Sequence, residues 1–247
     1  GKSVQVEYVS VNPTGPVHVG HARGAVLGSA LSRALAAAGF DVKREYYVND
    51  AGTQMEIFYE STFVRYAQAQ GSTAEEIPEN GYRGQYLIDL GQALSDEYGA
   101  KFMNMERPQA VSEIGAVGLD RMLDAISVDL ERIGVGFDVW FREHSLFESG
   151  QFEEAMTELE QRGYTIQRDG ATWFKSTELG EDKDNVIVRT SGQPTYFASD
   201  IAYHRNKFET RGFDRVIDIW GADHQGHVTR MKAVLRALGI DDNRLTI

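Results

Sequence analysis

Apolar and polar positions alternate along this chain in a pattern that predicts strands and helices in succession. A short apolar run over Val4–Val11 is typical of a buried strand, and a Pro/Gly cluster ends it. From Ala22 to Ala38, apolar residues recur three or four positions apart, which predicts an amphipathic helix. Its apolar face comprises Val26, Leu27, Ala30, Leu31, Ala34, Leu35 and Ala38. Asp41–Val48 then reads as a second strand, and strand, helix and strand in this order predict a parallel βαβ unit.

The rest of the chain continues this alternation, with a helical block in its middle. Apolar periodicity predicts helices over Met55–Ala69, Gln85–Tyr98, Pro108–Ile133, Phe147–Arg162 and Val228–Leu238. Apolar runs predict strands over Phe137–Arg142, Val186–Arg189 and Arg215–Trp220, and a hairpin of Tyr164–Arg168 with Thr172–Lys175 through Asp169-Gly170. These elements indicate the α/β class. Because open parallel sheets bind ligands beyond the carboxyl ends of their strands, the turns after the first two strands are expected at one rim.

Composition excludes several classes of protein. The 247 residues are 42% hydrophobic, with no apolar run long enough to span a membrane and no signal-like segment. The absence of cysteine excludes disulfides and cysteine-based zinc sites, and the six histidines lack a metal-binding spacing. A formal net charge of −12 repels polyanions on average. RNA binding would therefore need a local basic face or a separate module.

The turn after the first strand carries the clearest candidate chemistry. His18 and His21 lie three residues apart at the start of the predicted helix, with Gly20 between them. A helix N-terminus presents free N–H groups and a positive dipole end to an anion, and residues three apart share one face of a helix. Gly20 leaves room for a bulky group against the backbone. These features point to a phosphate or nucleotide site, and the simpler alternative is that the histidines only cap the helix.

The residues around these histidines resemble a known signature. The run from Ser10-Val11-Asn12-Pro13 to His18-Val19-Gly20-His21 resembles the HIGH motif of class I aminoacyl-tRNA synthetases in its arginyl form, with Val19 in place of the usual isoleucine. The stretch Tyr46-x-x-Asn49-Asp50-x-Gly52-x-Gln54 resembles a second family motif. The resemblance implies a Rossmann-like parallel sheet with helices on both faces and a mostly helical connective insertion. It divides the chain into a first catalytic half (1–54), an insertion with helical and hairpin elements (55–190) and a second catalytic half (191–247).

The resemblance also implies a pocket for L-arginine. Its expected residues are Ser10 and Asn12 beside the histidine motif, and Glu143, Tyr196 and Asp200 farther along the chain. A planar guanidinium needs a bidentate acceptor in a partly dry pocket, which a carboxylate supplies. Without the resemblance, Glu143 reads as a solvated carboxylate at a strand end. Tyr196 and Asp200 then read as a packed tyrosine and an acidic residue near a helix start.

ATP is the second expected substrate, accompanied by Mg²⁺ and without zinc. The resemblance assigns catalysis to His18 and His21, and ATP binding to these two histidines and Gly20 together with the turn after the Arg215–Trp220 strand. In that turn Gly221 would let the nucleoside approach, and Asp223 or His224 would bind sugar hydroxyls. His224 and His227 could instead be structural caps, and the sequence leaves these two interpretations open.

The sequence lacks the lysine-rich signature loop that class I synthetases place after this region. The expectation is therefore a catalytic core truncated before that loop, with little or no activity alone but weak arginine and ATP binding. tRNA(Arg) would bind through the longer protein, which is expected to be cytoplasmic and monomeric without a membrane partner. Three alternatives stay open: another nucleotidyltransferase with a His-x-Gly-His motif, a synthetase of cysteinyl or glutamyl specificity, and a non-catalytic binding module derived from a synthetase.

Overall fold

The computed structural model describes residues 1–221 and 225–247. Contacts between residues divide these into two units. The first unit comprises Gly1–Ser10, His21–Val48 and Phe137–Ile247, and the second comprises Val11–Gly20 and Asn49–Gly136.

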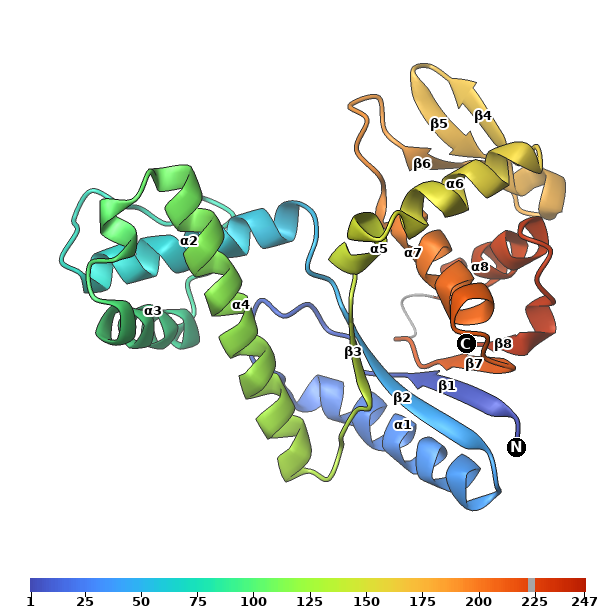
Figure 1. Cartoon of the computed structure of the whole chain (residues 1–247), viewed down its shortest axis with the longest axis horizontal. Coiled ribbons are helices and arrows are strands. Elements are labelled where there is room, and N and C mark those ends of the chain that lie inside the picture. Colours follow the sequence, from blue (N-terminus) through green and yellow to red (C-terminus); the bar gives the residue numbers. More distant parts are fainter. Residues whose placement is uncertain (222–224) are drawn as a thin grey trace. The chain divides into compact units, whose positions relative to one another are not determined.

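A five-stranded parallel sheet organises the first unit (Figure 1). Its strands are, in spatial order, β3 (Val139–Arg142), β2 (Asp41–Val48), β1 (Ser3–Glu7), β7 (Arg215–Asp218) and β8 (Leu245–Thr246). Every neighbouring pair is parallel. The parallel α/β sheet expected from the sequence is therefore confirmed, with β1 at its centre.

Helix α1 (Val19–Ala37) packs on one face of this sheet, but not through the face that its sequence predicts. The buried positions are the small residues Ala25, Gly28, Ser29 and Ser32. Of the predicted apolar face, Val26 and Leu27 are 57% and 56% exposed. The prediction is wrong because the helix lies too close to β1 for large side chains. A Cβ on Gly28 would lie 2.2 Å from Cγ of Tyr8, which directly follows β1.

The opposite face of the sheet is covered by α7 (Tyr196–Arg205) and the π-helical turn η3 (Asn206–Thr210) that continues it. Lys207 of this turn contacts Glu7 of β1, whereas the adjacent Tyr8 contacts α1. Successive residues of a strand point to opposite faces, so α1 and α7 lie on opposite sides of β1. Helices therefore occur on both faces, as expected.

Several further elements pack around α7. Helix α8 (Gln225–Ala237) contributes Val234 and Leu235 to the same buried core. The single helix predicted over Phe147–Arg162 is wrong: α5 (His144–Glu148) and α6 (Gln151–Gln161) are separate, because Gly150 adopts a left-handed conformation between them. The predicted hairpin is confirmed as β4 (Thr165–Arg168) and β5 (Ala171–Phe174), followed by β6 (Asn185–Val188). Short helical turns are η2 (Ser176–Leu179) and η5 (Asp242–Arg244).

The second unit is helical, as the sequence predicts for this stretch. It contains α2 (Thr53–Ala69), α3 (Gln85–Tyr98), the short η1 (Phe102–Asn104) and α4 (Arg107–Arg132). Aromatic residues of α2 are buried here, among them Phe58, Phe63 and Tyr66. They therefore belong to the core of this unit. Among the described residues, no helix has the length and apolarity needed to cross a membrane.

Candidate functional site

The loop after β1 leaves the sheet in a strained conformation. Val9 and Ser10 both have positive φ, at 69° and 43°, a region that non-glycine residues avoid and β-branched residues avoid most strongly. The Ser10 hydroxyl accepts a hydrogen bond of 3.0 Å from the backbone N–H of Tyr47, which fastens the loop to β2. Such strain persists where the surrounding structure enforces it, and it is common at functional sites. Contact of Ser10 with a substrate stays a prediction.

Two carboxylates and a phenol face one another at the carboxyl end of this sheet. Glu143, just after β3, is only 4% exposed, and its backbone N–H donates to the Val48 carbonyl at 3.0 Å. The Tyr47 phenol donates a hydrogen bond to the Glu143 carboxylate. Burial, followed by the charges of Glu143 and Asp200, raises the pKa of Tyr47 well above its ordinary value. Glu143 and Asp200, which the resemblance assigns to one pocket, therefore share one acidic environment.

Asp200 is the carboxyl of this group whose pKa lies near neutral pH. Burial raises its pKa from 3.8 to about 7, with Glu7 and Glu143 adding to the effect and His204 and Lys207 opposing it. At neutral pH this carboxyl is therefore poised between its neutral and ionised forms. A cation placed between Asp200 and Glu143 would favour the ionised form and would replace lost solvation with ion pairs. The arrangement suits a cationic ligand group.

Sequence reasoning missed Tyr47 and His204, which contact the predicted residues. Tyr47 is the second-to-last residue of β2, and the register between β2 and β3 pairs it with Phe141. His204 lies one helical turn after Asp200, and its ring contacts the Asp200 backbone carbonyl at 2.8 Å. The alternation along β2 and the i, i+4 spacing along α7 are the signals that could have identified them.

Tyr196 begins α7 and is 50% exposed. The preceding Thr195 caps the helix, because its hydroxyl accepts from the Ala198 N–H at 3.4 Å. Tyr196 and Asp200 thus occupy one face of α7 at the predicted spacing of four residues. The proposed role of Tyr196 as a wall of the pocket stays a prediction.

In the second unit, the two family-like motifs meet through their side chains. The Asn12 amide donates to the side-chain oxygen of Gln54 at 2.6 Å. Nδ1 of His18 accepts the backbone N–H of Gly20 at 3.1 Å, so His18 caps the start of α1. An accepting Nδ1 carries no proton, so the ring N–H is on Nε2. Capping and catalysis are compatible, since the Nε2–H remains a donor.

The structure says less about the other residues predicted to bind ATP. His21 belongs to the first unit and is partly buried, and Gly221 is exposed after β7. Asp223 and His224 lie outside the described residues. Within residues 1–221 and 225–247, no group of three or more histidine or acidic side chains has a geometry that could hold a metal ion.

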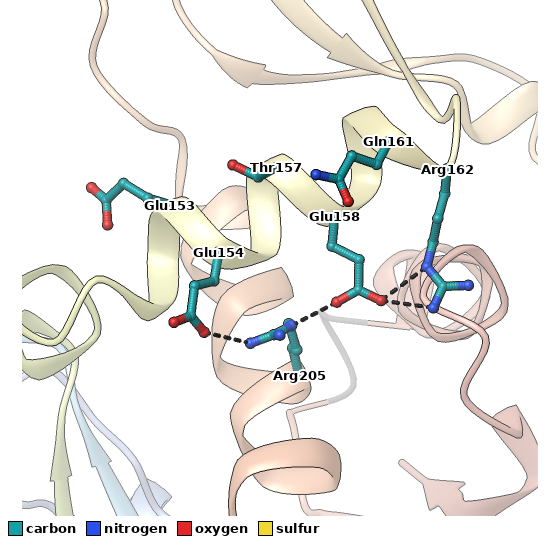
Figure 2. Close-up of a pocket in the computed structure, with 7 residues that line it drawn as sticks. All are labelled: Glu153, Glu154, Thr157, Glu158, Gln161, Arg162 and Arg205. Carbon is teal, nitrogen blue, oxygen red and sulfur yellow. Dashed lines mark hydrogen bonds and ion pairs between the residues drawn. The ribbon is translucent and has the colours of Figure 1, made fainter.

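A surface hollow lies elsewhere, between α6 and the end of α7 (Figure 2). It has a volume of about 550 Å³ and is lined by Glu153, Glu154, Thr157, Glu158, Gln161, Arg162 and Arg205. Arg205 lies between Glu154 and Glu158, at 3.1 and 2.8 Å, and Arg162 pairs with Glu158 at 2.8 Å. Four of its charged groups, Glu154, Glu158, Arg162 and Arg205, are paired within the wall, and it includes no predicted site residue. The hollow is therefore a surface ion-pair network rather than the candidate site.

Comparison with known proteins gives a consistent result over the whole chain. Residues 1–247 match the family described as tRNA synthetases class I (R), catalytic domain. The chain is 56% identical over 246 residues to an arginine--tRNA ligase of Dehalococcoides mccartyi, and 50% identical over 247 residues to one of Carboxydothermus hydrogenoformans. It is fully covered in both matches but spans only 44% of each relative.

Solved structures agree with this fold. A chain from Campylobacter jejuni, provisionally described as an arginyl-tRNA synthetase, superposes with a TM-score of 0.91 at 37% identity. That match covers all of this chain and 54% of the other. The arginyl-tRNA synthetase of Thermus thermophilus superposes with a TM-score of 0.74 at 18% identity, over all of this chain and 48% of that one, which supports the fold alone.

Proposed function

Because this chain belongs to the catalytic-domain family of the class I tRNA synthetases (R), we propose that it forms part of an arginine--tRNA ligase. In this proposal, L-arginine and ATP react to give arginyl-adenylate and pyrophosphate, and the arginyl group then passes to tRNA(Arg). The longer protein would act as a monomer in the cytoplasm. The observation that carries the proposal is the acidic environment shared by Glu143, Asp200 and Tyr47.

The acidic pocket accounts for the choice of amino acid. Two carboxylates can accept the planar, multiply donating guanidinium group, whereas a lysine ammonium is a compact charge that cannot engage them in the same way. The Tyr47 phenol, hydrogen-bonded to Glu143, orients one of these carboxylates. Ser10, Asn12 and Tyr196 would contact the rest of the substrate.

The chemistry of activation needs no covalent intermediate with the protein. The arginine carboxylate oxygen attacks the α-phosphorus of ATP, the bond to the bridging oxygen breaks, and pyrophosphate leaves with that electron pair. In the proposed site, the Nε2–H of His18, the N-terminus of α1 and His21 donate to the negative phosphate oxygens. Gly20, Gly221, Asp223 and His224 would hold the nucleotide. In the second step, a ribose hydroxyl of the tRNA displaces AMP.

Calorimetric titration of the 247-residue chain with L-arginine, L-lysine and ATP tests the pocket. We expect L-arginine and ATP to bind weakly and L-lysine to bind at least tenfold more weakly than L-arginine. In Glu143→Gln, L-arginine affinity should fall at least tenfold while ATP affinity is retained. Glu148→Gln is the matched control, because the Glu148 side chain is 69% exposed on α5. Equal binding of lysine and arginine would contradict the proposal, and ATP binding without arginine binding would favour another nucleotidyltransferase.

Activity of the isolated chain is a second test. Removal of one preorganised donor to a transition-state oxyanion typically costs about 2.7–4 kcal/mol. The chain has no lysine-rich loop to stabilise the phosphates, so arginine-dependent pyrophosphate exchange should be slow or undetectable. Robust exchange by the chain alone would overturn that expectation.

A further inference from the structure

Helix α7 meets the sheet through buried charges rather than through apolar side chains alone. Lys207 is 0% exposed, His204 and Asp218 are each 1% exposed, and Glu7 is 6% exposed. Nζ of Lys207 lies 2.6 Å from Oε2 of Glu7 and 2.8 Å from Oδ1 of Asp218. Burying such ions is expensive, and apolar residues often give equal or greater stability. The cluster therefore calls for an explanation other than stability.

His204 is the member of this cluster that reaches the proposed arginine pocket. One ring nitrogen, Nδ1, lies 2.8 Å from the Asp200 backbone carbonyl oxygen, and Nε2 lies 2.8 Å from Oδ2 of Asp218. Burial alone would raise the pKa of Asp218. The charges of Lys207, which binds the other carboxylate oxygen, and of His204 outweigh this effect and lower the pKa to about 2. This carboxyl is therefore ionised. A carbonyl and a carboxylate only accept hydrogen bonds. Both ring nitrogens therefore donate, which makes His204 an imidazolium.

The position of this charge matters to Asp200, one helical turn away. Burial, Glu7 and Glu143 disfavour the ionised form of the Asp200 carboxyl, whereas His204 and Lys207 favour it. Arg230 of α8 also interacts with Asp200. His204 is in turn close to Glu7 of β1 and Asp218 of β7. Among these groups, His204 alone both contacts the Asp200 backbone and carries a positive charge beside its side chain.

We propose that His204 is a positioning residue of the arginine pocket. Its imidazolium, held between the Asp200 carbonyl and Asp218, fixes this turn of α7 against the sheet and favours the ionised form of the Asp200 carboxyl, which a guanidinium requires. The inference deepens the proposed function and rests on it. His204 itself touches no reacting atom in this proposal, because its two nitrogens are engaged by Asp200 and Asp218.

The first test needs no substrate. Carbon-detected NMR of the 247-residue chain follows the Asp200 carboxyl through its titration in wild type, His204→Gln and Tyr203→Phe. The glutamine amide can still donate to Asp218 but carries no charge, so the Asp200 midpoint should rise by about 1 pH unit. Tyr203→Phe removes a buried hydrogen bond of 2.5 Å to Glu45 from the adjacent residue without changing the charge, and should leave the midpoint unchanged. An unchanged midpoint in His204→Gln overturns the inference.

A measurement on wild type keeps the inference testable if the glutamine variant does not fold. At pH 7, the nitrogen chemical shifts of His204 should show protons on both Nδ1 and Nε2. A neutral ring with a single protonated nitrogen overturns the inference, whatever the behaviour of the variants.

Arginine binding separates a charge effect from a general structural effect. At pH 6 we expect the His204→Gln variant to bind L-arginine about tenfold more weakly than wild type, since more of its Asp200 is protonated. At pH 9, where Asp200 is ionised in both proteins, the affinities should converge. Equal weakening at both pH values would show a structural role only and overturn the inference. If wild type binds no arginine while the NMR midpoint shifts as expected, the proposed function fails instead.

Discussion

Helices α1 and α7 pack on opposite faces of the same strand, β1, and they do so by opposite means (Figure 1). α1 approaches the sheet through small residues, with Gly28 against the Tyr8 ring, and leaves Val26 and Leu27 exposed. α7 and the turn η3 that continues it approach through large and charged residues, with Lys207 of η3 between Glu7 and Asp218. One contact depends on close approach and the other on paired charges. The second also places Asp200 and His204 at the candidate site.

The largest expected difference concerns the buried lysine on the α7 side. Lys207→Met keeps the side-chain volume but leaves Glu7 buried without its cation and Asp218 with His204 alone, so the free energy of unfolding should fall by about 3–5 kcal/mol at pH 7. Urea denaturation measures this loss. The loss should shrink at low pH, where the two carboxyls can be protonated.

Lys175→Met is the matched control for that variant. Lys175 pairs with Glu178 at 3.0 Å, but the two side chains are 27% and 53% exposed. Exposed ion pairs contribute about 0–1 kcal/mol, so this variant should lose less than about 1 kcal/mol. Equal losses in the two methionine variants would contradict the view that α7 depends on buried charge.

Close approach on the α1 side should give the next largest effect. In Gly28→Ala the new Cβ would lie 2.2 to 2.6 Å from three atoms of Tyr8, and Tyr8 is fully buried and cannot move away. Overpacking of this kind costs about 1–3 kcal/mol, which should exceed the roughly 1 kcal/mol that alanine gains over glycine within a helix. Thermal or urea unfolding should therefore show a net destabilisation.

Gly24, one turn earlier on α1, provides the control for this effect. No atom lies within 4 Å of a Cβ built there, so Gly24→Ala should stabilise the chain by up to about 1 kcal/mol through helix propensity alone. The two alanine variants should thus change stability in opposite directions. A stabilising Gly28→Ala would show that α1 does not rest closely on Tyr8.

Stability and L-arginine affinity should also depend on pH through Asp200 on the α7 side, whereas the α1 contact with Tyr8 should add no such dependence. The folded-state pKa of Asp200 is about 7 against 3.8 for an ordinary aspartate, so the native state binds more protons between these values. The contribution of Asp200 to stability therefore falls as pH rises from about 4 to 7. A guanidinium requires the ionised carboxylate, so below pH 7 L-arginine affinity should fall up to tenfold, or about 1.4 kcal/mol, per pH unit.

Calorimetry in buffers of different ionisation enthalpy checks this linkage, because proton release should accompany binding near pH 6. In Asp200→Asn, arginine binding should be weak at every pH, and the decline in stability between pH 4 and 7 should be reduced. A pH-independent arginine affinity in wild type would contradict the assignment of Asp200 as a guanidinium ligand.

These contrasts also show what could be predicted from the sequence. The strand–helix–strand order follows from local patterns, whereas the clustering of Glu143 with Asp200 was expected only from the family resemblance. The buried charges could not be predicted, because Glu7 and Lys207 are 200 residues apart and look like surface residues in the sequence. The π-helical turn that carries Lys207 was not predicted either, because the apolar pattern gave no sign of it.

Helix α1 shows a different reason for failure. Its leucines and valines recur with helical periodicity, which normally marks the packed face, yet glycine and serine occupy that face. Periodicity measures apolarity and does not measure how closely a backbone must approach. The contact of Gly28 with Tyr8 decides the orientation, and no hydrophobic pattern encodes that contact.

The smallest expected effect tests that orientation directly. Leu27→Gln replaces an apolar side chain that is 56% exposed by a polar one of similar helix propensity, so stability should change by less than about 0.5 kcal/mol. Leu235→Gln on α8 is the comparison, because Leu235 is 0% exposed and its replacement buries an amide in the core, with an expected loss of about 2–5 kcal/mol. Urea denaturation of both variants measures the difference. A loss above about 1.5 kcal/mol in Leu27→Gln would mean that α1 packs through its apolar face after all, and the small-residue contact with Tyr8 would then no longer explain its orientation.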